Sequence, residues 1–372
     1  MKHVLLSSMI CLFASSLAAD GHDNSKHHVA RDIPVATDCR PELCRLHPTT
    51  FGVYGELLYL QPNGSDLYYG VEAIGLDPNI AVPAVSPNWK VLEIDPDYQL
   101  GFQIGANVLF SKNTSLELNW ERIHAHDKES FTAPAGAGFM VGPFFDIGPN
   151  SAAYKVASGK VRSHFDQVNF EIGKQLCFFK DFYTKFYTGA AFLRIKENLT
   201  SKYSSTDGTI TRSVNTSSKF IGGGPQFGVN YRYRIFDHLF FGGDSTLSLF
   251  MGRLKNSTTF ESTTPELATL GVAQPNSQRT SVPNRTQLIP GFEQKLGFSY
   301  FFMGKSFRAN LEIGYQCQIY ANAVQTVDMT SPQVLPPEFV ATPDVGVFAV
   351  GFERTLSNYM LTGLYVTAGF QF

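Results

Sequence analysis

Strict alternation of apolar and polar residues over long segments is the feature of this sequence that most constrains its fold. Residues 98–110 read YQLGFQIGANVLF, in which every second residue from the tyrosine onward is apolar and those between are polar or glycine, with one exception. Segments 225–235 and 307–319 repeat the pattern. A period of two residues is that of a β-strand with one apolar and one polar face. The chain is therefore predicted to be all-β.

The connections between the alternating segments are of two kinds. Short turns flanked by aromatic residues recur near positions 112, 181, 237 and 304. Long polar segments rich in Ser, Thr, Asn, Gly and Pro lie between the resulting hairpins, and we expect them to be loops. These segments are 123–160, 196–218, 253–285 and 321–342. Short turns at one end and long loops at the other are typical of outer-membrane barrels.

Alternation alone does not decide which face points inward. A soluble barrel or sandwich would bury the apolar face, whereas a membrane barrel turns it toward lipid. The charged and amide-bearing polar face, the aromatic residues at every short turn and the secretory N-terminus described below favour the membrane barrel. In lipid every backbone polar group must be paired, and a closed barrel leaves no strand edge. We therefore predict a closed antiparallel transmembrane β-barrel with short periplasmic turns and long extracellular loops.

The number of strands is predicted to be about 10–12. A pair formed by residues 66–74 and 89–94 would raise the count from ten to twelve, and 345–353 is a further candidate that would make the count odd. The ten clear segments are 51–60, 98–110, 115–123, 162–176, 183–195, 219–235, 240–251, 286–302, 307–320 and 359–372.

The N-terminus indicates export from the cytoplasm. Residues 1–19 combine a short polar start, an apolar stretch too short to span a bilayer and a small-residue cleavage site, which is typical of a secretory signal peptide. Residues 20–50 are predicted to form a periplasmic N-terminal segment, and 51–372 the barrel. The predicted location is the outer membrane of a Gram-negative cell.

Cys39 and Cys44 are candidates for a local disulfide in this oxidising compartment. A zinc site is the weaker alternative, because no second Cys or His pair follows at ligand spacing. The histidine-rich residues 20–28 fit a disordered tail better than a copper site. We expect Cys177 and Cys317 to be buried or lipid-facing thiols, and we predict no cofactor and no metal.

The polar face supplies the candidate functional residues. We expect them to line a pore, or alternatively to fill a narrow barrel as a ladder of salt bridges. Their charges are of both signs, so strong ion selectivity is not expected. The pore-lining candidates are Glu117, Asn119, Glu121, Glu171, Arg232, Arg234, Glu293, Lys295, Arg308 and Glu312.

Enzyme-like patterns are few. His124–Asp127 reads HAHD at the predicted exit from a strand into a long loop, where a membrane hydrolase would place such residues. No matching nucleophile or second acid is legible, so we predict a solvated loop and no enzyme. The formal net charge of −2 gives no case for nucleic acid as a partner.

The chain ends on LYVTAGFQF, an alternating segment with an aromatic C-terminus. We interpret it as the closing strand, with Leu364, Val366 and Phe370 toward lipid. Phe372 and Phe370 are the candidate signal for the barrel-assembly machinery. Expected partners are that machinery, outer-membrane lipids and small hydrophilic solutes.

Four segments together resemble a known family: GELLYLQP (55–62), DPDYQLGFQIG (95–105), GGGPQFGVNYRYRI (222–235) and LTGLYVTAGFQF (361–372). The chain is similar to the Legionella-type major outer membrane proteins, pore-forming barrels distantly like the chlamydial ones. The family commonly has an aromatic residue, often Trp, where this chain has Leu60. The resemblance implies a porin, an abundant surface antigen and a homo-oligomer linked by disulfides, and it implies no catalytic residues.

Three hypotheses of function follow. The favoured one is a diffusion pore for small hydrophilic solutes. The alternative is a non-conducting barrel whose long loops bind host or environmental partners, as an adhesin does. A barrel enzyme that uses His124 or His126 is the weakest.

Overall fold

The computed structural model describes residues 49–64, 67–74, 89–110, 113–134, 139–142, 154–179, 181–204, 211–263, 277–304, 307–330 and 351–372. They belong to one compact unit, Asp38–Phe372. Residues 1–48, with the predicted signal peptide, Cys39 and Cys44, lie outside the described ranges. The described part of the chain has no helix that is both long enough and apolar enough to cross a bilayer.

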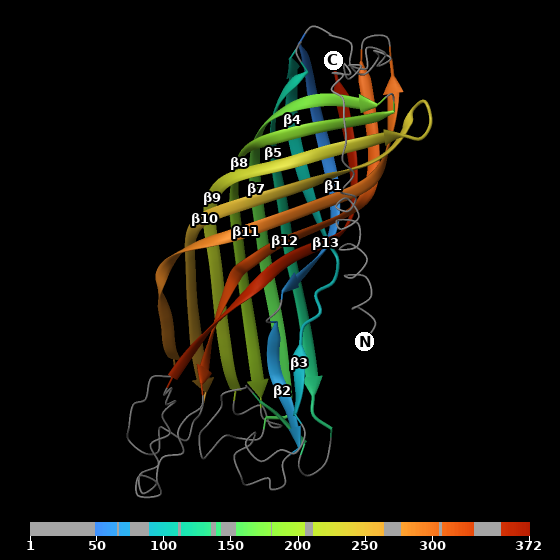
Figure 1. Ribbon diagram of the computed structural model, residues 1–372. Helices are drawn as coiled ribbons and strands as arrows, with labels where there is room; N and C mark the ends of the chain where they lie inside the picture. Colours follow the sequence, from blue (N-terminus) through green and yellow to red (C-terminus); the bar gives the residue numbers. More distant parts are fainter. Residues whose placement is uncertain are drawn as a thin grey trace, which may run out of the picture. The chain divides into compact units, whose positions relative to one another are not determined.

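Ten antiparallel strands form a closed barrel (Figure 1). Each strand pairs with the barrel strand that precedes it in the chain, and β1 closes the ring against β13. The strands are β1 (Thr50–Gly64), β4 (Gln99–Phe110), β5 (Thr114–Thr132), β7 (Val156–Phe179), β8 (Phe182–Ser204), β9 (Thr211–Arg234), β10 (Leu239–Thr263), β11 (Ser277–Met303), β12 (Arg308–Thr330) and β13 (Gly351–Gln371). The predicted closed antiparallel barrel is confirmed.

The additional pair that would have given twelve barrel strands is outside the barrel. β2 (Tyr68–Ile74) and β3 (Trp89–Glu93) do pair, but they join β6 (Phe139–Gly142) in a separate three-stranded sheet. Tyr69 on β2 packs in an apolar cluster with residues of β7 and β8, and its carbonyl accepts a hydrogen bond from Tyr203 Oη. The barrel therefore has ten strands, the lower end of the predicted range.

The predicted short turns are confirmed, but several predicted loops are largely strand. The turns at one end join β4 to β5, β7 to β8, β9 to β10 and β11 to β12. At the other end, β5 continues to Thr132 and β10 to Thr263, through residues predicted to be loop. Strands that leave the bilayer have no lipid-facing side to keep apolar, so runs of Ser, Thr and Asn pair in water without a hydrophobic alternation.

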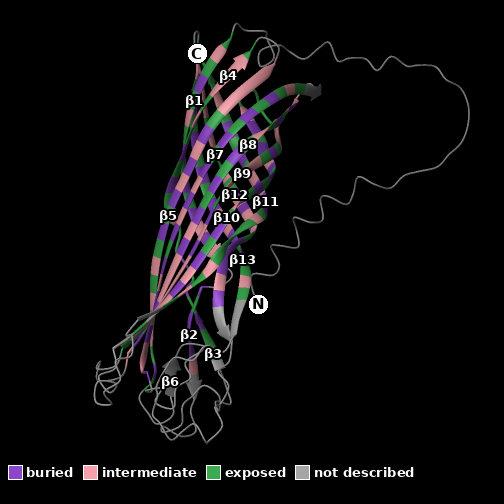
Figure 2. Cartoon of the chain, turned by 90° about the vertical axis from the view of Figure 1, so that its left-hand side faces the viewer, coloured by how far each residue is buried: buried purple, intermediate pink, exposed green. Residues whose placement is uncertain are grey.

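In the half of the barrel nearer the short turns, exposed and buried residues alternate along the strands (Figure 2). The exposed residues are mostly apolar and the buried ones mostly polar, so apolar side chains point outward and polar ones inward. Phe192 and Leu247 are more than 60% exposed, whereas Gln226 and Gln316 are fully buried. Because burying unpaired polar groups and exposing large apolar ones is unfavourable in water, this arrangement fits a wall surrounded by lipid. The predicted orientation of the two faces is thus confirmed.

In the half nearer the long loops, charged residues appear on the outer face and many apolar residues in the interior, where Glu197 and Asn256 are also buried. On β8 the outward residue Phe192 is followed by Arg194, while the inward Lys185 gives way to Leu193. We call this level the polarity boundary, and it crosses five neighbouring strands. The outward residues on either side of it are Trp120 and Arg122, Val168 and Asp166, Phe192 and Arg194, Ile221 and Lys219, and Met251 and Arg253.

A bulge in β12 brings the walls of the long-loop half together. The register of β12 shifts between Tyr320 and Val324, and Asn322 has a positive φ of 59°. Beyond the bulge, the Gln325 backbone N–H donates to Ser218 Oγ on β9 at 3.0 Å. Its carbonyl accepts from Asn256 Nδ2 on β10. These strands are not neighbours of β12 in the barrel, so the hydrogen bonds cross the lumen.

Candidate functional site

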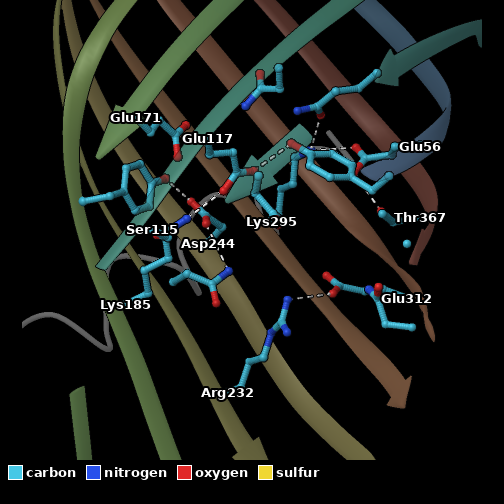
Figure 3. A pocket seen from close by; sticks show the side chains of 18 of the residues that line it. Glu56, Ser115, Glu117, Glu171, Lys185, Arg232, Asp244, Lys295, Glu312 and Thr367 are labelled. Atoms are coloured by element: carbon cyan, nitrogen blue, oxygen red, sulfur yellow. Dashed lines mark hydrogen bonds and ion pairs between the residues drawn. The ribbon is translucent and has the colours of Figure 1, made fainter. Parts of the chain in front are cut away.

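A polar cavity of about 300 Å³ lies in the lumen of the short-turn half (Figure 3). We call it the chamber. Seven carboxylates and three cationic side chains line it, a formal excess of four carboxylates. The carboxylates are Glu56, Glu117, Glu121, Glu171, Asp244, Glu293 and Glu312, and the cations are Lys185, Arg232 and Lys295.

Each cation of the chamber contacts a carboxylate. Lys295 Nζ lies 2.6 Å from Glu56 Oε1, and Lys185 Nζ lies 2.7 Å from Glu117 Oε2. The Arg232 guanidinium lies 3.6 Å from Glu312 Oε2. All three pairs join strands that are not neighbours in the barrel. Figure 3 shows the six side chains. The chamber is therefore braced by ion pairs, as the salt-bridge alternative expected, yet it retains open volume.

The remaining carboxylates are held by neutral donors. Gln318 Nε2 donates to both oxygens of Glu121 at 3.1 and 3.0 Å. Glu293 Oε1 accepts from Gln167 Nε2 at 2.6 Å and from Tyr320 Oη at 2.8 Å. The bonds from Gln318 and Gln167 run from β12 to β5 and from β7 to β11, strands that are far apart around the ring. They form a polar layer across the lumen at the inner end of the chamber.

An apolar plug lies beyond this layer. Phe165, Phe220, Phe250, Tyr320 and Tyr359 are at most 1% exposed and belong to one cluster, which we call the septum. The ring of Phe165 lies 5.5 Å from that of Tyr320 and 6.0 Å from that of Tyr359. Tyr320 also lies 6.1 Å from Phe250 on β10, two strands away in the ring. The septum gathers side chains from five strands, β7, β9, β10, β12 and β13.

Eight of the ten pore-lining candidates line the chamber. Arg234 and Arg308 are not among its lining residues. Arg234 lies at the last position of β9, where Nε is 3.0 Å from Asp181 Oδ1 and Nη2 donates to Tyr183 Oη. Arg308 is the first residue of β12. Both therefore lie at the short-turn mouth, and a role of any of the ten in conduction stays a prediction.

The candidates named from the sequence omitted three charged residues of the chamber. Glu56, Lys185 and Asp244 lie within segments that were predicted to be strands, at alternate positions with outward apolar residues. Reading the inward position off every predicted strand would have found them. No sequence signal shows which of these residues pair across the lumen, because the partners come from strands far apart in the chain.

His124–Asp127 lies within β5 and not in a loop, which corrects the sequence prediction. His124 and His126 point to the outer face of the barrel, and the His124 ring lies 4.5 Å from that of His164. The predicted loop was wrong because the strand extends past the bilayer. Within the described residues no group of three or more His, Cys, Asp or Glu is arranged to hold a metal ion.

Cys317 is a half-buried free thiol on the outward face of β12. The side chain of Cys177 and both residues of the predicted disulfide are outside what the structure describes.

The C-terminal residues close the barrel. Phe370 and Phe372 are exposed on the outer face, together with Leu364 and Val366. The backbone N–H of Phe372 donates to the Phe51 carbonyl at 2.9 Å, and the N–H of Phe51 donates to the Phe372 carbonyl at 3.0 Å. The last residue of the chain is therefore paired with the start of β1.

Several solved structures are similar to the chain. The outer membrane protease OmpT from Escherichia coli shares 11% identity, with 87% of this chain and 96% of that chain covered and a TM-score of 0.38. A Pseudomonas aeruginosa FadL homologue shares 7%, covering 87% and 90% with a TM-score of 0.24. The toluene transporter TodX of Pseudomonas putida shares 7%, covering 87% and 89% with a TM-score of 0.26. Similarities at this level carry no argument about the activity of this chain.

No curated protein sequence matches the chain. The family model described as the Legionella pneumophila major outer membrane protein precursor matches residues 46–372, which includes every barrel strand. The lipid-facing wall of the short-turn half and the closed ring agree with that description. The chain therefore belongs to the Legionella major outer membrane protein family, and its barrel lies in the outer membrane of a Gram-negative bacterium.

Proposed function

We propose that the protein is a channel for small hydrophilic solutes and that the septum closes it in the conformation described. The chamber carries this proposal: a polar cavity of about 300 Å³ inside a closed outer-membrane barrel, lined by charged and amide side chains. Such a lining replaces the hydration shell of a polar solute at little cost. A barrel that served only as an anchor would have no need of an open polar volume.

The charges of the chamber favour cations. Seven carboxylates face three cationic side chains, so the lumen has a formal excess of four negative charges. Rings of carboxylates select for cations in channels. This refines the expectation from the sequence, which weighed mixed signs without Glu56, Lys185 and Asp244. We therefore propose a modest preference for small cations and neutral polar solutes over anions.

Opening requires the septum and the adjacent polar layer to move. Both side-chain polar atoms of fully buried Gln316, and Oε1 of Gln318, have no hydrogen-bond partner among the described residues. A buried polar group left unpaired costs about 1–3 kcal/mol. The closed layer is therefore less stable than a fully paired one, which supports a transition to a hydrated, open state.

The completeness of the septum favours a second candidate function. A lumen closed by side chains that are at most 1% exposed also fits a non-conducting barrel whose long-loop end binds host or environmental partners. The three-stranded sheet at that end packs through Tyr69 in an apolar cluster with residues of β7 and β8. Under this hypothesis, the chamber stabilises the barrel and does not conduct solutes.

Planar-bilayer recording of the refolded full-length protein distinguishes the two. We expect wild type to show infrequent, stepwise, ohmic openings, and the septum variant Phe165→Ala/Phe250→Ala to open far more often. The matched control is Phe170→Ala/Phe192→Ala, two lipid-facing phenylalanines of the same wall that are 48% and 64% exposed. The control should record as wild type does.

The outcomes separate the hypotheses. Silence of wild type and of the septum variant at every voltage would contradict the channel. Silence of wild type with openings only in the septum variant would support the non-conducting barrel. Under a potassium chloride gradient, the reversal potential should indicate cation preference, and Glu171→Gln/Asp244→Asn should shift it toward zero.

We also propose that the protein is not an enzyme and that Phe372 and Phe370 form the assembly signal. His124 and His126 lie on the outer face without a neighbouring nucleophile in the described part of the chain. Deletion of Phe372 should sharply lower the yield of folded barrel in cells while purified, refolded protein conducts as wild type. An unchanged yield would contradict the assembly role.

A further inference from the structure

A row of basic side chains crosses the outer face of five adjacent strands. The paired residues are His124 on β5 with His164 on β7, His164 with Lys196 on β8, Lys196 with Lys219 on β9, and Lys219 with Lys255 on β10. We call these five residues the cation row. At about 4.8 Å between strands, the four steps of the row span about 19 Å.

The three lysines of the cation row have no compensating charge among the described residues, and His124 accepts a hydrogen bond from Arg122 Nε at 3.0 Å. Like charges directly opposite each other on paired strands are destabilising. The next row toward the short turns adds Arg194 and Arg253, and its single acid, Asp166, is already 3.4 Å from Arg122. Within the described residues, Lys196, Lys219, Lys255, Arg194 and Arg253 form no ion pair with any acid. An uncompensated row of this kind indicates an anionic partner that lies outside the barrel.

The position of the row identifies the kind of partner. It lies directly on the long-loop side of the polarity boundary, where Phe192 and Met251 precede Arg194 and Arg253 along their strands. Trp120 precedes Arg122, whose guanidinium carbon lies 5.7 Å from the indole centroid. Tryptophan and basic residues of this kind are enriched where hydrocarbon meets head groups. The long-loop end of an outer-membrane barrel faces the cell exterior.

We propose that the cation row, with Arg194 and Arg253, binds the phosphate groups of a phosphorylated glycolipid in the outer leaflet. Guanidinium and ammonium groups form strong charge-assisted hydrogen bonds to phosphate oxygens, and arginine does so with two N–H groups at once. The acyl chains of the same lipid would lie against the apolar outer wall of the short-turn half. The row covers β5 and β7–β10 only, so the bound lipid occupies one side of the barrel.

The test measures binding of diphosphoryl lipid A to the full-length barrel in a neutral detergent. The variant Arg194→Gln/Lys196→Gln/Arg253→Gln/Lys255→Gln removes four charges from exposed or half-exposed positions. The matched control Lys90→Gln/Arg279→Gln/Arg285→Gln/Arg354→Gln removes four charges from exposed positions elsewhere in the long-loop half. We expect affinity to fall by about tenfold or more in the first and to be unchanged in the control.

Three further arms make the result decisive. Dephosphorylated lipid A should bind wild type and variant equally weakly. Inorganic phosphate should compete only in large excess; if it binds as tightly as the lipid, the assignment to a lipid head group is overturned. Arg194→Lys/Arg253→Lys should retain most of the affinity. An equal loss of affinity in the matched control, or no loss of affinity in the fourfold row variant, would overturn the proposal. Should the fourfold variant not refold, Lys196→Gln/Lys255→Gln against Lys90→Gln/Arg354→Gln gives the same comparison with a smaller loss.

Discussion

The two halves of the barrel are built from the same strands, yet they obey opposite rules. In the short-turn half, Phe192 lies outside and Lys185 inside, while a few residues further along β8 Arg194 lies outside and Leu193 inside. The first half surrounds a polar chamber, and the second packs an apolar core that includes the septum. A single strand therefore behaves as a membrane strand for part of its length and as a soluble one for the rest.

The difference shows that the surrounding solvent, and not the strand itself, decides which face is apolar. Lipid around the wall of the short-turn half makes outward polar groups unfavourable, and hydrogen bonds satisfy those that point inward. Water around the wall of the long-loop half removes that constraint and restores the ordinary burial of apolar side chains. The polarity boundary is thus a physical marker of the level at which the bilayer ends.

The largest expected effect contrasts two phenylalanines of β7 on opposite sides of the boundary. Phe165 is fully buried in the septum, and Phe170 is 48% exposed toward lipid. Phe165→Ala should lower the free energy of unfolding by about 3–5 kcal/mol, because it leaves a cavity in a packed core. Phe170→Ala should cost much less, since lipid fills the space. Urea unfolding in phospholipid vesicles measures the free energy of unfolding of both variants. Equal losses would show that the long-loop half has no packed core.

The second effect tests where lipid ends. Leu247 is 62% exposed on the outward face of β10 in the short-turn half. Leu247→Arg should destabilise the barrel by about 2–4 kcal/mol, as a charge facing the bilayer interior does. Ser257, two positions beyond Lys255 on the same face, serves as the control, and Ser257→Arg should have almost no effect. A similar cost at both positions in the same vesicles would place the bilayer edge elsewhere.

The smallest effect contrasts ion pairs inside and outside the wall. Lys295 and Glu56 form a pair whose side chains are 18% and 5% exposed, and Lys295→Met should cost about 1–3 kcal/mol by leaving a buried carboxylate without its partner. The double variant Lys295→Met/Glu56→Gln should recover part of that loss. Arg122→Met removes the outward pair with Asp166 and should cost about 1 kcal/mol or less. Equal costs in urea unfolding would mean that the chamber is as open to solvent as the outer face.

Much of the short-turn half was predictable from the sequence. Its strands, their inward and outward faces, and eight residues of the chamber follow from the alternation and the short turns. The long-loop half was not predictable, because its strands beyond the bilayer carry polar residues on their outer face and their sequences resemble loops. Residues 124–127, predicted to lie in a loop, continue β5 for this reason.

By itself, the sequence determined the strand period, the asymmetry of the connections and the closing role of the C-terminal segment, because these depend on residues close together in the chain. Only the tertiary structure decided the number of barrel strands, since β2 and β3 pair in either sheet equally well by pattern. It also decided the septum, which gathers Phe165, Phe250 and Tyr320 from three strands. The cation row likewise exists only through the register of five strands, because closure and register join residues that no local pattern relates.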